Sequence, residues 1–94
     1  MGKIFDEFDR RVSNYGAIDV EIGSDINGKT VNVGERVMFT KSSPGGISYG
    51  TITKIKQRVL SNFSVYQYFF IKSDKGRETV KITGEIIKLW KELF

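Results

Sequence analysis

The sequence predicts a mostly β chain with flanking helices, an α+β fold in which about five antiparallel strands close into a small β-barrel. Three observations predict it. Short stretches of alternating apolar and polar residues recur through the middle of the chain, which is typical of strands with one buried face. Breaks rich in Gly, Asn, Ser and Pro separate these stretches, and the two ends carry apolar residues at helical spacing. We expect a single domain over residues 1–94, with helices at residues 3–15 and 84–94 and the barrel at residues 17–82.

The N-terminal segment, residues 3–15, has the pattern of an amphipathic helix. Ile4, Phe8, Val12 and Tyr15 fall on one stripe of such a helix, and a glycine follows where helices commonly end. We expect this helix to cover one end of the barrel, because a small domain needs every apolar face it has. The alternative is a helix that docks on a partner.

The first predicted strand, residues 17–22, alternates regularly. Ile18, Val20 and Ile22 are predicted to face the core. The break after it contains Asn27-Gly28, the dipeptide preferred in a type I′ hairpin turn, where both central residues need a positive φ. We therefore expect a tight hairpin to lead into the next strand.

A loop with one Pro and two Gly divides residues 33–57 into two strands. In the first, Val37 and Phe39 alternate with polar residues and are predicted to face the core. In the second, Ile52 and Ile55 differ in parity, so both can face the core only if a β-bulge or sharp twist lies between them. Such a bend also curls a short sheet.

The next strand, residues 64–72, is apolar on both faces. Phe69 lies on one face, and Tyr66, Tyr68 and Phe70 share the other. A strand of this kind is either central and covered, or it displays an aromatic face. We expect the C-terminal helix to cover the aromatic row.

The last two predicted elements are a strand and a helix. Residues 77–82 are predicted as the final strand, with Val80 and Ile82 facing inward. Residues 84–94 have helical spacing and are apolar on nearly every side, so this helix either covers the sheet or meets another chain. The candidate residues for such a partner or oligomer interface are Ile86, Trp90, Leu93 and Phe94.

The composition excludes several kinds of chemistry. The chain contains no Cys and no His, which removes thiolate chemistry, the commonest general base and the commonest transition-metal ligand. Asp19 and Glu21 project from one strand face and could share a cation, but solvated charge is the commoner explanation of this pattern. We therefore expect no enzyme, no cofactor and no metal site. Because no membrane-spanning run or signal peptide is visible, we expect a cytoplasmic protein.

The net charge of +4 is unevenly distributed. Residues 1–33 carry four basic and six acidic residues, whereas residues 34–94 carry eleven basic and five acidic residues, a net +6. Such an excess favours phosphate binding through charge and counterion release, and tyrosines offer stacking surfaces for unpaired bases. The alternative is that the lysines keep a small sheet soluble and block edge pairing. The predicted nucleic-acid-binding residues are Lys41, Lys54, Lys56, Arg58 and Lys81, and the candidate stacking residues are Tyr49, Tyr66 and Tyr68.

The segment D-I-N-G-K-T-V-N-V-G-E-R-V, residues 25–37, resembles the opening of many small bacteriophage-encoded proteins, such as the YopX-like group. Their pattern is D-x-N-G-K-x-I-x-x-G-D-x-V, and here Val31 and Glu35 replace the usual Ile and Asp. The spacing G-x-I-x-x-I that begins at Gly50 resembles the second strand of SH3-like and KOW-like barrels. The resemblance, which covers about a third of the chain, implies an SH3-like barrel of phage or prophage origin but no particular activity, because such barrels host many roles.

These observations predict a non-enzymatic binding module, a phage or prophage accessory protein that binds nucleic acid without sequence preference. The alternative is a protein–protein interaction module that inhibits or redirects a host protein, as an anti-defence or host-takeover factor would. Such a module could form a homo-oligomer through its C-terminal helix.

Overall fold

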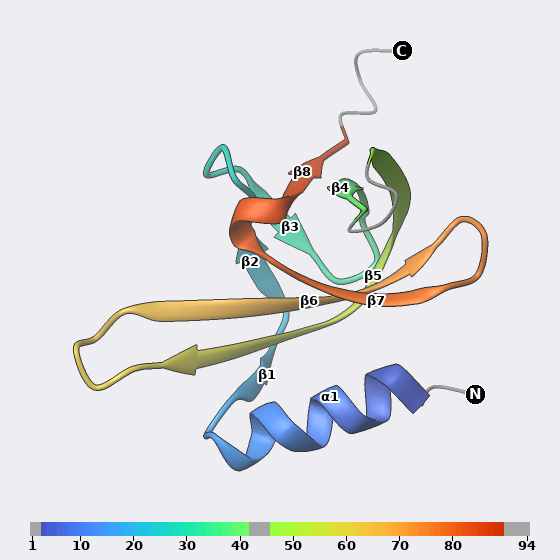
Figure 1. Ribbon diagram of the computed structural model, residues 1–94. Helices are drawn as coiled ribbons and strands as arrows, with labels where there is room; N and C mark the ends of the chain where they lie inside the picture. The colour runs from blue at the N-terminus through green and yellow to red at the C-terminus, as the bar shows by residue number, and fades with distance from the viewer. Residues whose placement is uncertain (1–2, 42–45, 90–94) are drawn as a thin grey trace.

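The computed structural model describes residues 3–41 and 46–89, and Figure 1 shows how their elements are arranged. One helix, α1 (Lys3–Asn14), lies beside a six-stranded antiparallel sheet, and a two-stranded sheet completes the structure. The large sheet has the order β7-β6-β5-β4-β8, and β1 pairs with β5. In chain order the strands are β1 (Ile18–Val20), β2 (Ile22–Ser24), β3 (Thr30–Asn32), β4 (Arg36–Thr40), β5 (Ile47–Val59), β6 (Val65–Ser73), β7 (Glu78–Ile82) and β8 (Ile86–Lys88), with the short 3-10 helix η1 (Thr83–Glu85) before β8.

The core is built from alternate residues of these strands, as the period of a strand with one buried face requires. Val37 and Phe39 of β4 face inward, as predicted, and β2–β3 adds Val31 to the same cluster. No helix in the described part of the chain is long and apolar enough to cross a membrane. The buried apolar cluster comprises Val31, Val37, Phe39, Ile52, Ile55, Phe69, Ile71 and Ile86.

The mostly β character and the N-terminal helix are confirmed, but the predicted closed SH3-like barrel is wrong. Among the described residues, β7 pairs with β6 alone and β8 pairs with β4 alone, so the sheet stays open between β7 and β8. Closure would require a ladder of backbone hydrogen bonds between these strands.

The predicted C-terminal helix over residues 84–94 is wrong wherever the structure describes it. Ile86 and Ile87 lie in β8, which pairs antiparallel with β4. β-branched residues lose less freedom in a strand than in a helix, and alternation buries Ile86 while leaving Ile87 exposed. Ile86 is therefore a core residue and is not free to meet another chain. The other three candidate interface residues, Trp90, Leu93 and Phe94, lie outside the described residues.

The aromatic face of β6 is covered by α1, and so the expected cover by the C-terminal helix is wrong. Phe5 and Phe8 of α1 make edge-to-face contacts with Phe70, and Phe8 makes another with Tyr68. Tyr66, the third residue of the row, stays exposed beyond the helix. The N-terminal helix thus begins where predicted and ends one residue earlier, at Asn14, but it lies along a sheet face and not over a barrel end.

Two predicted inward faces are only partly correct. The strand expected at residues 17–22 is split into β1 and β2; Val20 packs against the core as predicted, but Ile18 and Ile22 are exposed. On β7 the face that points into the curled sheet carries Thr79 and Lys81, so the predicted inward residue Ile82 is exposed. Periodicity gives the alternation of a strand, but it does not say which of two mixed faces is buried.

The longest strand, β5, bends in the middle. The register between β5 and β6 shifts between Ile52 and Lys54, and both Ile52 and Ile55 are fully buried. The predicted bulge is therefore confirmed. Gly50 stands where β5 crosses β6 closely, because a Cβ at this position would lie 2.5 Å from the carbonyl oxygen of Lys72.

The hairpin between β2 and β3 depends on a buried carboxylate. Asp25 is 2% exposed, and it accepts hydrogen bonds from the backbone N–H groups of Asn27, Lys29 and Lys88 at 2.8 to 2.9 Å. The predicted type I′ turn is wrong. It would have Asn27 and Gly28 as central residues, both with a positive φ, and only Gly28 has one. The turn bond runs from the Gly28 N–H to the Asp25 carbonyl, so Ile26 and Asn27 are the central residues. Asp25 thereby joins this hairpin to β8.

We predict that Asp25→Ala destabilises the protein by about 2–4 kcal/mol, because it leaves buried N–H groups without an acceptor. Urea unfolding followed by circular dichroism measures the change. Asp74→Ala is the matched control, since this exposed carboxylate should contribute little. Equal free energies of unfolding for the two variants would contradict the role assigned to Asp25.

Candidate functional site

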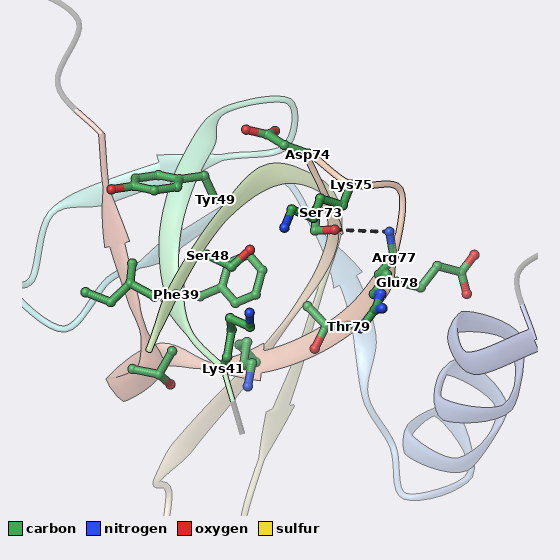
Figure 2. A pocket seen from close by; sticks show the side chains of 13 residues that line it. Phe39, Lys41, Ser48, Tyr49, Ser73, Asp74, Lys75, Arg77, Glu78 and Thr79 are labelled. Atoms are coloured by element: carbon green, nitrogen blue, oxygen red, sulfur yellow. Dashed lines mark hydrogen bonds between the residues drawn. The ribbon is translucent and has the colours of Figure 1, made fainter. Parts of the chain in front are cut away.

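A basic cleft opens between the β4–β5 hairpin and the β6–β7 hairpin, with a volume of about 490 Å³. Figure 2 shows Lys41, Ser48, Arg77 and Thr79 around this opening, whereas Tyr49 points away from it. The alternation of β5 explains the difference, because Ser48 and Tyr49 lie on opposite faces of the strand. The cationic residues that line the basic cleft are Lys41, Lys75, Arg77 and Lys81, and the hydroxyl residues are Thr40, Ser48, Ser73, Tyr49 and Thr79.

Two acidic residues also line the basic cleft, and both are engaged by other groups. The Arg36 guanidinium donates two hydrogen bonds to the Asp74 carboxylate at 2.9 and 2.7 Å, which lowers the pKa of Asp74 and raises the pKa of Arg36. Glu78 accepts a hydrogen bond from the Phe5 N–H at 3.3 Å, and its carboxylate points toward α1. Asp74 is thus paired with Arg36, whereas Glu78 keeps its negative charge on the side of the cleft that faces α1, and the four cations of the cleft outnumber its two acids.

The basic cleft has a buried cation at its inner wall. Lys81 is 9% exposed, and its ammonium lies 6.0 Å from the centre of the Phe39 ring. None of the four cleft cations forms an ion pair within the part of the chain that the structure describes. The cleft therefore presents unneutralised positive charge over an apolar floor.

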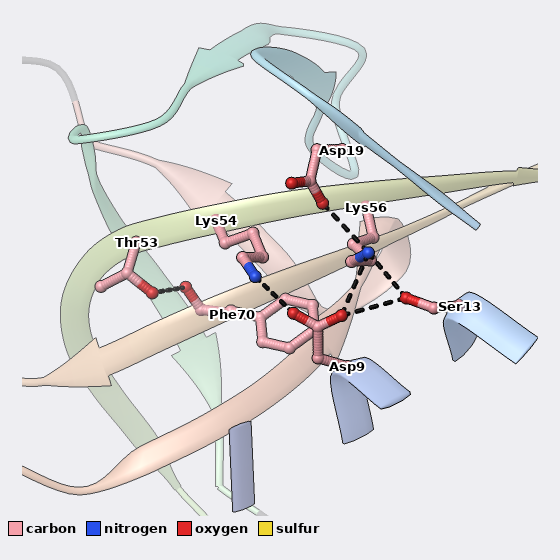
Figure 3. Close-up of polar contacts among 7 residues, drawn as sticks. All are labelled: Asp9, Ser13, Asp19, Thr53, Lys54, Lys56 and Phe70. Carbon is pink, nitrogen blue, oxygen red and sulfur yellow. Dashed lines mark hydrogen bonds and ion pairs between the residues drawn. The ribbon is translucent and has the colours of Figure 1, made fainter. Parts of the chain in front are cut away.

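Lys54 and Lys56, two of the predicted nucleic-acid-binding residues, belong instead to a helix clamp that holds α1 on the sheet (Figure 3). The Asp9 carboxylate binds the Lys54 ammonium and lies 3.0 Å from that of Lys56. Lys56 also approaches Asp19 at 3.1 Å and donates to the Ser13 hydroxyl at 2.8 Å. We define the helix clamp as these five residues: Asp9, Ser13, Asp19, Lys54 and Lys56.

The electrostatics of the helix clamp follow from its partial burial. Burial alone would raise the pKa of Asp9, but hydrogen bonds from Lys54, Lys56 and Ser13 lower it below its ordinary value. Burial alone would likewise lower the pKa of Lys56, and its hydrogen bonds to Asp9 and Asp19 raise it instead. The charges of the clamp thus stabilise one another.

The remaining predicted residues are dispersed. The Arg58 guanidinium lies 5.2 Å from the centre of the Tyr15 ring, away from the basic cleft. Tyr66 is exposed on the β5–β6 hairpin, and Tyr68 lies beneath α1. Of the eight predicted binding and stacking residues, the structure brings Lys41, Lys81 and Tyr49 to the cleft.

Sequence reasoning left Lys75 and Arg77 out of the predicted site. They flank the turn glycine between β6 and β7, and both line the cleft that this turn forms with the β4–β5 hairpin. The sequence does show two cations around a turn glycine. Their neighbours across the cleft belong to β4 and β5, however, and residue spacing does not show that these strands lie close to the turn. No group of three or more His, Cys, Asp or Glu in the described residues could hold a metal ion, so Asp19 and Glu21 form no such site with Asp25.

The family model described as "Domain of unknown function (DUF7205)" matches residues 24–92. The chain belongs to this family. No curated protein and no solved structure matches the chain. The DUF7205 match includes every residue that lines the basic cleft, whereas α1 and β1 lie before it. The cleft is therefore part of the family domain, and Asp9 of the helix clamp comes from outside it.

We predict that Asp9→Asn lowers the free energy of unfolding by about 1–2 kcal/mol at neutral pH, because Lys56 loses a carboxylate partner in a partly buried site. Since folding lowers the pKa of Asp9, the wild-type advantage is present above about pH 4 and is lost as the pH falls through the folded pKa. Urea unfolding from pH 7 to pH 2 measures both effects. A difference that stays constant down to pH 2 would contradict the clamp.

Proposed function

We propose that this DUF7205 protein is a non-enzymatic module that binds nucleic acid without sequence preference, and that it does so through the basic cleft. One observation carries the proposal: Lys41, Lys75, Arg77 and Lys81 converge on one concave surface without an ion pair among the described residues. Phosphate groups bind such a surface through charge and counterion release. The resemblance to phage proteins supports the cytoplasm of a bacterial host as its place of action.

The distribution of aromatic residues favours contact with phosphates over contact with bases. Tyr49 stands at the rim and points away from the opening, and Phe39 is 5% exposed on the floor. Base stacking requires an exposed ring face, which these positions do not offer inside the cleft. The hydroxyls of Ser48 and Thr79 instead supply hydrogen bonds that suit phosphate oxygens. Binding should therefore depend on salt and hardly on sequence.

We predict that Lys75→Glu/Arg77→Glu weakens binding to a mixed-sequence oligonucleotide at least about tenfold and reduces the salt slope by about 2. Fluorescence anisotropy at several salt concentrations measures both quantities. The double variant should fold normally, because both side chains are exposed on a turn.

The matched control is Arg10→Glu/Arg11→Glu, which makes the same change of charge on the exposed side of α1. It should weaken binding much less, because these arginines do not line the basic cleft. Equal losses for the two double variants would reduce the effect to net charge and contradict a site at the cleft. No binding by the wild type at low salt would refute the proposed function itself.

A second candidate function, binding to a host protein, is favoured by the tip of the β5–β6 hairpin. This hairpin projects from the rest of the structure in Figure 1, and Phe63 at its tip is 86% exposed. Phe63 has a φ of 67°, which an L residue rarely adopts, and two backbone hydrogen bonds between Leu60 and the residues Phe63 and Ser64 hold it there. A preorganised exposed aromatic ring is a typical interface anchor.

We predict that Phe63→Gly keeps the free energy of unfolding within about 1 kcal/mol of the wild type, because glycine adopts this φ without strain. If the tip anchors a host protein, this variant should lose a protein that the wild type retains from a nuclease-treated bacterial lysate. Ile4→Ala, which removes an exposed apolar side chain on α1, is the control. Equal retention by all three proteins would exclude the tip as the anchor.

A further inference from the structure

Lys81 occupies a position that the strand pattern normally gives to an apolar residue. Its backbone partner on β6 is the fully buried Phe69, so both residues belong to the core-facing rows of their strands. Its side chain is about nine-tenths buried and extends toward Phe39 of β4, across the open edge of the sheet. Its ammonium thus lies at the inner wall of the basic cleft.

The charge of Lys81 is not matched within the described part of the chain. Among the described residues, no hydrogen bond or ion pair involves its ammonium, and its cation–π contact is with the Phe39 ring. A cation–π contact offsets part of the cost of removing an ammonium from water, but it supplies no countercharge. An anion that enters the cleft and reaches this group would supply both the countercharge and the hydrogen-bond acceptors.

The depth of Lys81 restricts the form of that anion. Lys41, Lys75 and Arg77 are exposed at the rim, whereas Lys81 lies behind them. A phosphodiester inside a nucleic-acid chain has a sugar on each side, so it lies along a rim more readily than it enters a cleft. A terminal phosphate has one substituent, and it carries up to two negative charges at neutral pH. Thr79 lies two residues before Lys81 on the same strand face, and it adds a hydroxyl to the cleft wall between the opening and Lys81.

We infer that the basic cleft binds the terminal phosphate of a nucleic-acid strand, with Lys81 as the inner anchor and the exposed cations holding the adjoining backbone. This inference rests on the proposed function and adds the chemical form of the ligand. The cleft volume of about 490 Å³ leaves room for a phosphate and the sugar that carries it.

The test compares two oligonucleotides of one mixed sequence, one with a 5′-phosphate and one with a 5′-hydroxyl, both labelled at the 3′ end. In an anisotropy titration the wild type should bind the phosphorylated strand about tenfold more tightly, as one additional charge-assisted contact allows. Equal affinities would overturn the inference and leave the proposed function intact. No binding of either strand at low salt would overturn both.

Two lysine variants identify the anchor. Lys81→Met preserves the length and apolar character of the stem, so it should fold, and it should bind both strands with one affinity. Lys41→Met removes a rim cation and should weaken both strands by a similar factor, so that the tenfold preference survives. A preference that persists in Lys81→Met would overturn the assignment of Lys81. Thermal melts of both variants establish that they are folded.

Competition with 5′-AMP distinguishes the two sources of a terminal phosphate. The mononucleotide lacks the backbone that the rim cations would hold, so it should displace the phosphorylated strand only at concentrations at least about tenfold above those of the unlabelled strand. Displacement at equal concentrations would overturn nucleic acid as the source and assign the cleft to a free nucleotide.

Discussion

The bend in β5 is the constraint on which the rest of the structure depends. Its first half pairs with β4 and its second half with β1, while β6 runs along its other edge through the bulge after Ile52. The bend in β5 thus divides the sheet into two halves, one around β4 and one around β1, which face different parts of the molecule. The β4–β5 hairpin curls toward the β6–β7 turn and forms the wall of the basic cleft, and the other half provides the surface on which α1 lies. A straight β5 would form neither the wall of the cleft nor the surface under α1.

The basic residues are divided between these two halves according to whether an acid from the N-terminal region reaches them. Asp9 of α1 and Asp19 of β1 bind Lys54 and Lys56, so two of the six acids in residues 1–33 form ion pairs where the N-terminal segment covers the sheet. The cleft lies beyond the reach of these acids, and its own two carboxylates are held by Arg36 and by the Phe5 N–H. Four cations therefore line the cleft against two acids, a grouping that sequence position alone does not reveal.

Sequence patterns predicted the helices and strands better than they predicted which elements pack or pair with one another. The helix at residues 3–15, the bulge in β5 and the inward Val37 and Phe39 follow from local periodicity, and local periodicity needs no tertiary information. The C-terminal segment was misread because Ile86 and Ile87 satisfy a helical stripe as well as a strand, and only the pairing with β4 decides between them. The predicted binding residues are dispersed for the same reason, and only Lys41, Lys81 and Tyr49 of them line the cleft. Lys54 and Lys56 share an exposed strand face in the sequence pattern, but that face is covered by a helix far away in the chain.

The basic cleft includes the inner face of β7, the strand at the open edge of the sheet. This face carries Thr79 and Lys81, and the Lys81 ammonium lies over the Phe39 ring of β4. An apolar side chain of similar length would fill the space of Lys81 at a lower cost in desolvation, because this lysine is about nine-tenths buried. Positions where a residue opposes the local packing rule are commonly those that serve a site. In the proposed function, the open edge beside β7 gives an anion access to Lys81.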